Sequence, residues 1–293
     1  MTLIEYIINV ILLIIIGLAL GIGAGFIGAS AVSIVVPILY VIFKFDILFA
    51  LGTSLLVDII GASIIAYLYW KKDNSDLETG AKLGLISFFF AIIGALIAFQ
   101  IADFSESVYT GIFSWFNIFL GLLIIRDGQK SLKREKQLGI KINEMEQVPK
   151  NKFTKWLEDV SPRTKNIFLV GISACIGINA GIFGAGGGFL ITIILIYLMQ
   201  YKILKAVGTA TFMMVLTASG AFIPYFIRFG IVMGPVAQGI SVLFASIIGV
   251  CSILGGTLGT QVAHKISENY LKMILGVLII IFSILMIIQG FFS

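Results

Sequence analysis

Residues 177–188 read GINAGIFGAGGG, and residues 21–30 read GIGAGFIGAS. Each of these glycine-rich stretches joins two apolar runs and contains no charged residue. Glycine inside a helix costs about 1 kcal/mol relative to alanine, so the three glycines at 186–188 disfavour a continuous helix. The sequence therefore predicts two apolar helical pairs, each interrupted at a junction (the first at 21–30, the second at 177–188). We expect helices to restart at Phe189 and near Ala31.

The composition places these junctions in a membrane protein. The 293 residues are 59% hydrophobic and only 12% charged, and their mean hydropathy is +1.09. Soluble domains carry about 25% charged residues, so a soluble enzyme and a disordered chain are both excluded. The two cysteines, Cys175 and Cys251, are too few for a disulfide framework or a metal site. No cofactor is expected.

Ten apolar runs follow one another along the chain, five on each side of a charged segment at 126–166. A helix needs about 20 residues to cross the hydrocarbon core, and the two runs that flank each junction are shorter than the others. They form either tilted crossings or re-entrant hairpins. The expected fold is an all-α polytopic membrane protein with membrane repeats at 1–125 and 167–293. The runs cover residues 3–20, 30–43, 47–70, 82–102, 109–125, 167–180, 185–200, 204–227, 235–262 and 270–291.

The charged segment at 126–166 carries the whole net charge of the chain. It holds eleven of the twenty Lys and Arg residues but six of the fifteen Asp and Glu residues, a surplus equal to the net charge of +5. Short basic segments of membrane proteins stay in the cytoplasm. We therefore expect a cytoplasmic linker here, with both termini outside the cell (plasma) membrane. Nucleic-acid binding is not expected, because it would need a basic face on a folded domain.

The two halves are predicted to be an internal repeat. An offset of 156 residues aligns the pairs Gly21/Gly177, Gly25/Gly181, Gly52/Gly208 and Thr53/Thr209. Because each half crosses the membrane an odd number of times, the second repeat is inverted relative to the first. Inverted repeats place a binding site near the midplane at the repeat interface, and this favours a transporter.

The helix ends at the two junctions are the first candidate site. Helix N-termini present free N–H groups and a partial positive charge, so two of them near the midplane would bind an anion without a buried lysine. Close helix packing through small residues is the alternative for both junctions. The residues expected to bind the anion here are Gly25, Gly28, Ala29, Ser30, Gly184, Gly186, Gly187 and Gly188.

Polar side chains near the junctions are further candidates. Thr53, Ser54 and Thr209 follow the broken pairs, and Asn179 lies inside the second junction. Hydroxyls in an apolar run either contact substrate oxygens or bond back to the preceding turn of their own helix. Arg228, near the end of its run, either draws anions or extends its charged head to the membrane surface.

Asp58 stands in the middle of the run at 47–70 and is the only acid well inside an apolar run. An ionisable group within the membrane is a functional residue by default, and desolvation favours its neutral form. Asp58 is therefore a candidate for proton coupling, with a hydrogen-bonded structural carboxyl as the alternative. The aligned residue in the second repeat is Met214, so we expect an asymmetric site.

At these residues the chain resembles the sulfite exporter TauE/SafE family of bacterial and plant membrane proteins. The resemblance rests on the two junctions, on Pro37, and on the stretches GTSL at 52–55 and AVGT at 206–209, and it runs nearly end to end. It implies transport of small sulfur-containing anions such as sulfite, sulfoacetate, related sulfonates or thiosulfate. The first half departs from the family pattern, because residues 28–31 are less glycine-dense than expected. This departure favours the second junction as the main anion site.

The leading hypothesis is a secondary transporter of a small oxyanion or sulfonate that works by alternating access around a midplane site. Proton-coupled transport of an organic carboxylate is a second hypothesis, and a membrane scaffold without transport is a third. A membrane enzyme is not expected, because only one acid and no histidine lies at depth. The expected partners are a small anion and the lipid bilayer, with a second copy of the chain as a further option.

Overall fold

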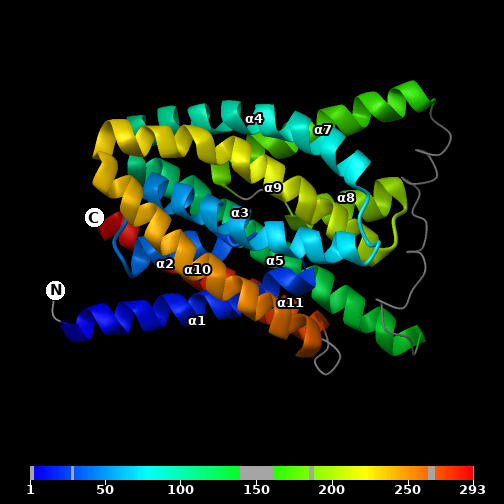
Figure 1. Cartoon of the computed structure of the whole chain (residues 1–293), viewed down its shortest axis with the longest axis horizontal. Helices are drawn as coiled ribbons and strands as arrows, with labels where there is room; N and C mark the ends of the chain where they lie inside the picture. Colours follow the sequence, from blue (N-terminus) through cyan, green and yellow to red (C-terminus); the bar gives the residue numbers. More distant parts are fainter. Residues whose placement is uncertain (1–2, 28–29, 139–160, 185–187, 263–267, 293) are drawn as a thin grey trace.

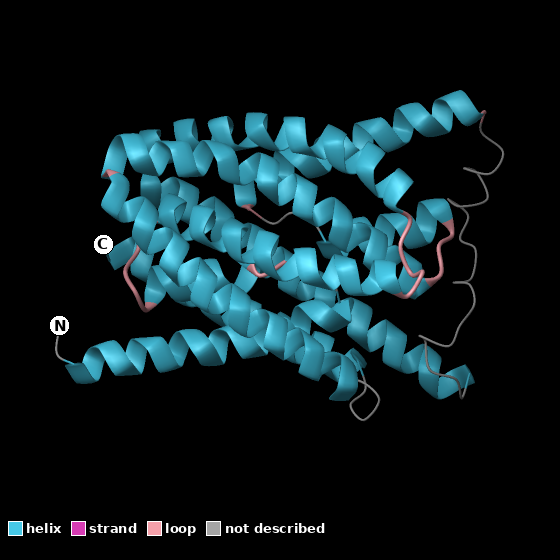
Figure 2. Cartoon of the chain, viewed as in Figure 1, coloured by secondary structure: helices cyan, strands magenta, loops and turns pink. Residues whose placement is uncertain are grey.

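The computed structural model describes residues 3–27, 30–138, 161–184, 188–262 and 268–292, and the fold is described for these residues. They form helices and the turns between them, with no strand in any of these ranges (Figure 2). The helices are α1 (Leu3–Ile27), α2 (Val32–Val41), α3 (Ile47–Lys71), α4 (Leu77–Phe104), α5 (Glu106–Leu138), α7 (Pro162–Phe183), α8 (Gly188–Met199), α9 (Ile203–Arg228), the π-helical η2 (Phe229–Met233), α10 (Pro235–Val262) and α11 (Glu268–Phe292).

The helices lie along one common direction (Figure 1). Both termini lie at one end of the bundle, and α5 ends and α7 begins at the opposite end (Figure 1). The described residues contain ten α-helices, one at each of the ten predicted apolar runs. The orientation of the two ends relative to the cytoplasm stays a prediction.

The outer surface of the bundle is apolar. Seven helices in the described ranges are long and apolar enough to cross a membrane. Large side chains on their outer faces are exposed, with Phe89 at 63% and Trp115 at 67%. Such a surface would be an aggregation hazard in water, whereas lipid covers it favourably. The chain is therefore a polytopic, all-α membrane protein, as predicted.

The short helices α2 and α8 begin inside the bundle. They contain 10 and 12 residues, which corresponds to about 15 and 18 Å of helix. Neither can cross a hydrocarbon core of about 30 Å. In Figure 1, α2 runs back toward the end of the bundle at which α1 begins, and α8 runs back toward the end at which α7 begins. This arrangement fits the re-entrant alternative.

The helices break later in each junction than the sequence indicated. The first helix of each pair continues through the glycines that open its junction, α1 to Ile27 and α7 to Phe183. Gly184 then terminates α7 with a φ of +63°, a left-handed conformation that glycine adopts at little cost. The next helices start at Val32 and Gly188, each within one residue of the predicted restart.

Glycines bring α7 close to α4. A Cβ atom added at Gly181 would collide with the backbone of Ala91 and Ala95, and one added at Gly177 would collide with the backbone of Ser87. Small residues allow this close approach between membrane helices. The packing alternative therefore accounts for the early glycines of the second junction.

The same kind of contact recurs between α1 and α10. A Cβ atom added at Gly17 or Gly21 would meet the backbone of α10 just as one at Gly177 or Gly181 meets that of α4. The matching offset for this helix is 160 residues, not the 156 that the sequence comparison gave. Gly17, Gly21 and Gly25 are each four residues apart. Both offsets therefore pair Gly177 and Gly181 with glycines of α1, but with different ones. The inversion of the repeats relative to the membrane stays a prediction.

The centre of the bundle is formed by α3 and α9, the two most buried candidate spans. Gly52 of α3 packs against Tyr225 of α9, and Gly208 of α9 packs against Tyr69 of α3. These two contacts are related by the predicted offset of 156 residues. The alignment of Asp58 with Met214, which lie on the same two helices, therefore agrees with the packing.

The predicted linker at 126–166 is partly helical. α5 continues to Leu138 and α7 begins at Pro162, where the Oγ of Ser161 accepts a hydrogen bond from the N–H of Thr164. Residues 139–160 lie outside the described residues. The boundaries of the linker and of the two repeats stay predictions.

Gly181→Ala is expected to lower the free energy of unfolding by about 1–3 kcal/mol, because the added methyl group forces α7 away from α4. Gly171→Ala is the matched control on the same helix, since no atom lies within 4 Å of a Cβ added there. This control is expected to leave stability unchanged or to raise it by up to about 1 kcal/mol. Thermal unfolding of the purified proteins in detergent measures both, and equal effects would contradict the close packing.

Candidate functional site

Asp58 is the only Asp, Glu, Lys or Arg among the described residues whose side chain is buried, with 3% exposed. It lies 11 residues after the start of α3, about 17 Å along the helix and near its middle. Its Oδ2 accepts a hydrogen bond of 2.5 Å from the Oγ of Ser30. Its Oδ1 accepts one of 2.6 Å from the N–H of Ala31. The carboxyl group is therefore held at the first junction.

These bonds make Asp58 the cap of α2. The N-cap residue of this helix, Ala31, has no side-chain acceptor of its own, whereas α3 uses the carboxylate of Asp46 for its own N–H groups. The Oγ of Ser30 adds a second partner by accepting a hydrogen bond of 3.3 Å from the N–H of Val32. The sequence predicted that the start of α2 binds an anion. In the structure, the group bound there is the carboxyl group of Asp58.

The second junction has a different composition. The residue aligned with Asp58 is Met214, which is 2% exposed and carries no charge. None of the described residues places a buried acid at the start of α8. Of the predicted anion-binding residues, Gly25 lies inside α1, and Gly184 and Gly188 are the described ends of the second junction. Four others, Gly28, Ala29, Gly186 and Gly187, lie outside the described residues.

A small cavity of about 20 Å³ adjoins Asp58. Its lining comes from α1, α2, α3, α9 and α10 and includes Gly61, Thr211 and Met214. The volume of this cavity is about that of one water molecule, and most of its lining is apolar.

The structure does not bring the predicted hydroxyl groups together. Thr53 lies in the second turn of α3 and shares a hydrogen bond of 2.9 Å with Ser241 of α10. Thr209 lies in the second turn of α9, which starts at the opposite end of the bundle (Figure 1). The hydroxyl of Ser54 donates to Ala50 of its own helix, and that of Thr209 donates to Lys205. The hydroxyl groups of these two residues therefore bond back to the preceding turn of their own helix, as the second alternative predicted.

Thr209 instead joins a polar cluster that sequence reasoning missed. Its Oγ1 accepts a hydrogen bond of 2.9 Å from the N–H of Asp76, in the turn between α3 and α4. The carboxylate of Asp76 accepts a bond of 2.6 Å from the hydroxyl of Tyr201 and lies 3.8 Å from the ammonium of Lys205. Burial opposes ionisation of Asp76, but the bonds from Tyr201 and Thr79 and the charge of Lys205 outweigh it and lower the pKa of Asp76 from its ordinary value.

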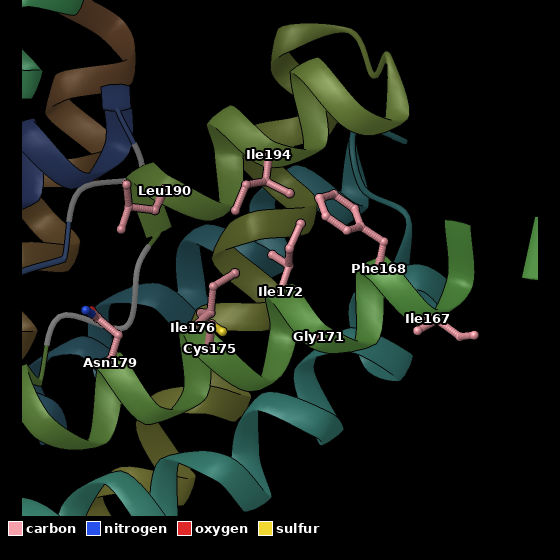
Figure 3. Close-up of a pocket in the computed structure, with 9 residues that line it drawn as sticks. All are labelled: Ile167, Phe168, Gly171, Ile172, Cys175, Ile176, Asn179, Leu190 and Ile194. Atoms are coloured by element: carbon pink, nitrogen blue, oxygen red, sulfur yellow. The ribbon is translucent and has the colours of Figure 1, made fainter. Parts of the chain in front are cut away.

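Asn179 lies at the inner end of an apolar groove between α7 and α8 (Figure 3). The groove has a volume of about 580 Å³, and its opposite end lies at Ile167, which is 72% exposed. Asn179 is the one polar side chain in its lining. The Oδ1 of Asn179 is buried and has no hydrogen-bond partner, so this predicted site residue keeps an unused acceptor near the second junction.

Arg228 has a partner at the end of the bundle where both termini lie. Its guanidinium donates to Asp103 at 3.2 and 2.5 Å and lies 4.8 Å from the ring centre of Phe99. The neighbouring cavity of about 280 Å³ is also lined by Asp46 and Glu106. Three carboxyl groups against one paired guanidinium do not attract anions, so the structure gives Arg228 a role in joining α9 to α4.

Half-helices that begin inside the membrane beside polar groups are typical of secondary transporters. Comparison with known families agrees with this class: the model described as "Sulfite exporter TauE/SafE" matches residues 13–286. The chain therefore belongs to this family and is a multi-pass membrane transporter, not an enzyme. The resemblance predicted from the junctions is confirmed.

Relatives with similar sequences are described as transporters. The probable membrane transporter protein MJ0441 of Methanocaldococcus jannaschii is 25% identical over 97% of this chain and 97% of its own length. The corresponding values for the probable membrane transporter protein YunE of Bacillus subtilis are 25%, 97% and 99%. YdhB of the same organism, also named as a probable membrane transporter protein, is 28% identical over 73% of this chain and 78% of its own. No solved structure matches this chain.

Asp76→Asn is expected to lower the melting temperature at neutral pH, because it removes the charge that Tyr201 and Lys205 stabilise. A carboxyl group whose pKa is depressed on folding stabilises the protein above its unfolded pKa, and this contribution is lost as the pH falls through the folded value. The difference from wild type should therefore shrink below about pH 4. Asp73→Asn, in the same turn, is the control, and an equal, pH-independent effect of both would contradict this role.

Proposed function

We propose that this transporter carries a small oxyanion, sulfite or a small sulfonate, and that its main binding site is the N-terminus of α8. The observation that carries the proposal is the binding of the Asp58 carboxylate to Ala31 and Ser30 at the start of α2. Carboxylates and sulfonates offer similar charged oxygen acceptors to such donors. The description of the family supports the sulfur-containing class.

The two junctions have different roles in this proposal. The first junction contains a carboxyl group of the protein itself, that of Asp58, which occupies the donors at the start of α2. The second has Met214 at the aligned position, so the start of α8 has no described protein carboxylate to compete with a substrate. A helix N-terminus favours negative charge without needing a buried lysine. The transported anion is therefore assigned to the start of α8.

Asp58 also couples transport to protons in this proposal. Protonation removes the negative charge that the N-terminus of α2 attracts, and it weakens the bonds from Ser30 and Ala31. The adjoining cavity of about 20 Å³ has the volume of about one water molecule, which would deliver the proton. A loosened α2 can then move relative to α3 during alternating access. A transporter of organic carboxylates would use the same donors and the same coupling, so only the substrate separates the two hypotheses.

Purified protein in proteoliposomes is expected to move sulfite and sulfoacetate along an imposed gradient faster than protein-free vesicles do. The panel also contains thiosulfate, acetate and malonate, because carboxylates fit the same donors. Radiolabel uptake measures each rate. Faster transport of the carboxylates than of the sulfur oxyanions would select the second hypothesis. Transport of none of them would favour a scaffold without transport activity.

Asp58→Asn is expected to retain transport and to flatten its dependence on pH. The amide keeps an oxygen that accepts from the N–H of Ala31 but cannot take up or release the coupled proton. In the wild type, the protonated fraction of a single group changes by about tenfold per pH unit on one side of its titration, and flux should follow it. Asp103→Asn is the control, since this acid pairs with Arg228 at the end of the bundle. An unchanged pH profile for Asp58→Asn would remove the coupling role.

A further inference from the structure

Asn117 of α5 is a buried amide without any partner. Its side chain is 1% exposed, and both Nδ2 and Oδ1 are buried without a hydrogen bond. Ser114, one turn earlier, is equally buried but donates its hydroxyl to Thr110 of the same helix. Burying an unpaired amide is costly, and hydrocarbon supplies no water to relieve it. An apolar residue would pack at position 117 without this cost.

Asn117 lies at about the same depth as Asp58. The N–H of Ile47, at the start of α3, donates to Oε1 of Glu106, at the start of α5, so the two helices begin at the same level. Asp58 and Asn117 each lie 11 residues after these starts, which is about 17 Å along each helix. Asn117 is therefore in the middle of the membrane, where α2 and α8 begin.

The side chains around Asn117 on α5 contact the second junction. The ring of Phe116 stacks on that of Phe183, the last residue of α7, with the ring centres 4.1 Å apart. Two turns after Asn117, Ile124 belongs to a buried cluster that includes Ile34 of α2 and Ile193 of α8. Asn117 thus lies between the contact of α5 with the end of α7 and its contacts with the first turn of α2 and the second turn of α8.

We propose that Asn117 is a substrate contact, and that its carboxamide donates a hydrogen bond to an oxygen of the anion bound at the start of α8. This inference rests on the proposed function and adds a specific side chain to it. A carboxamide donates hydrogen bonds without a positive charge, so it can hold an anion that must also leave. Asn117, whose amide has no partner, and the start of α8, which has no described protein carboxylate, then form one binding site.

Asn117→Leu tests this contact in the full-length protein, with sulfite as the probe. The KM for sulfite transport in proteoliposomes is expected to rise about tenfold or more, as for the loss of one hydrogen bond to a charged group. The melting temperature without sulfite is expected to stay the same or rise, because an unpaired polar group is removed. Ser114→Ala is the matched control on the same helix and should leave KM unchanged.

Asn117→Asp provides a second variant of the same shape. It replaces the amide by a carboxyl group that donates only when it is protonated, so sulfite transport should fall as the pH is raised and return as the pH is lowered. If Asn117 only stabilises the fold, Asn117→Leu should lower the melting temperature and leave the KM unchanged. This result would overturn the inference. Wild-type sulfite transport in the same vesicles would leave the proposed function intact, whereas its absence for every anion in the panel would remove both.

Discussion

A helix that begins inside the hydrocarbon core must find partners for its first N–H groups, and the interior of this protein depends on how α2 meets that requirement. Lipid offers no hydrogen bonds, and each unsatisfied group costs several kcal/mol. Asp58 supplies the missing acceptor from α3, and Ser30 supplies a second. The same contact makes a charged residue tolerable at mid-membrane depth, because the helix N-terminus attracts its charge. The uncapped start of α2 explains why an acid is present at this depth, and the acid explains how α2 can begin there.

Much of the fold could be predicted because its signals are local. Apolar runs of membrane length predict helices, since lipid leaves few other options for the backbone. Glycine clusters indicated where α2 and α8 begin to within one residue, and the basic segment indicated where the halves join. Asp58 could be singled out for a similar reason, because one acid in an apolar run is visible without any knowledge of its neighbours.

The rest depends on contacts between distant segments. The register of α1 against the second half was wrong by one helical turn, because glycines spaced by four residues align equally well in two registers. Thr53 and Thr209 match in sequence, but they lie at opposite ends of the bundle because the helices that carry them run in opposite directions. Asn117 gave no signal at all, since an amide in an apolar run resembles a packing residue until its lack of partners is seen. Asp76 lies in a short turn, and its partners come from more than 100 residues away.

The glycine contacts join each half of the chain to the other. The first helix of each half packs closely on the fourth helix of the opposite half, α1 on α10 and α7 on α4. Backbones that approach this closely cannot slide without collision. We therefore expect the mixed pairs α1–α10 and α4–α7, and not the two sequence repeats, to move as units in an alternating-access cycle. The moving boundary would then run between these pairs, along the half-helices and the centre of the bundle.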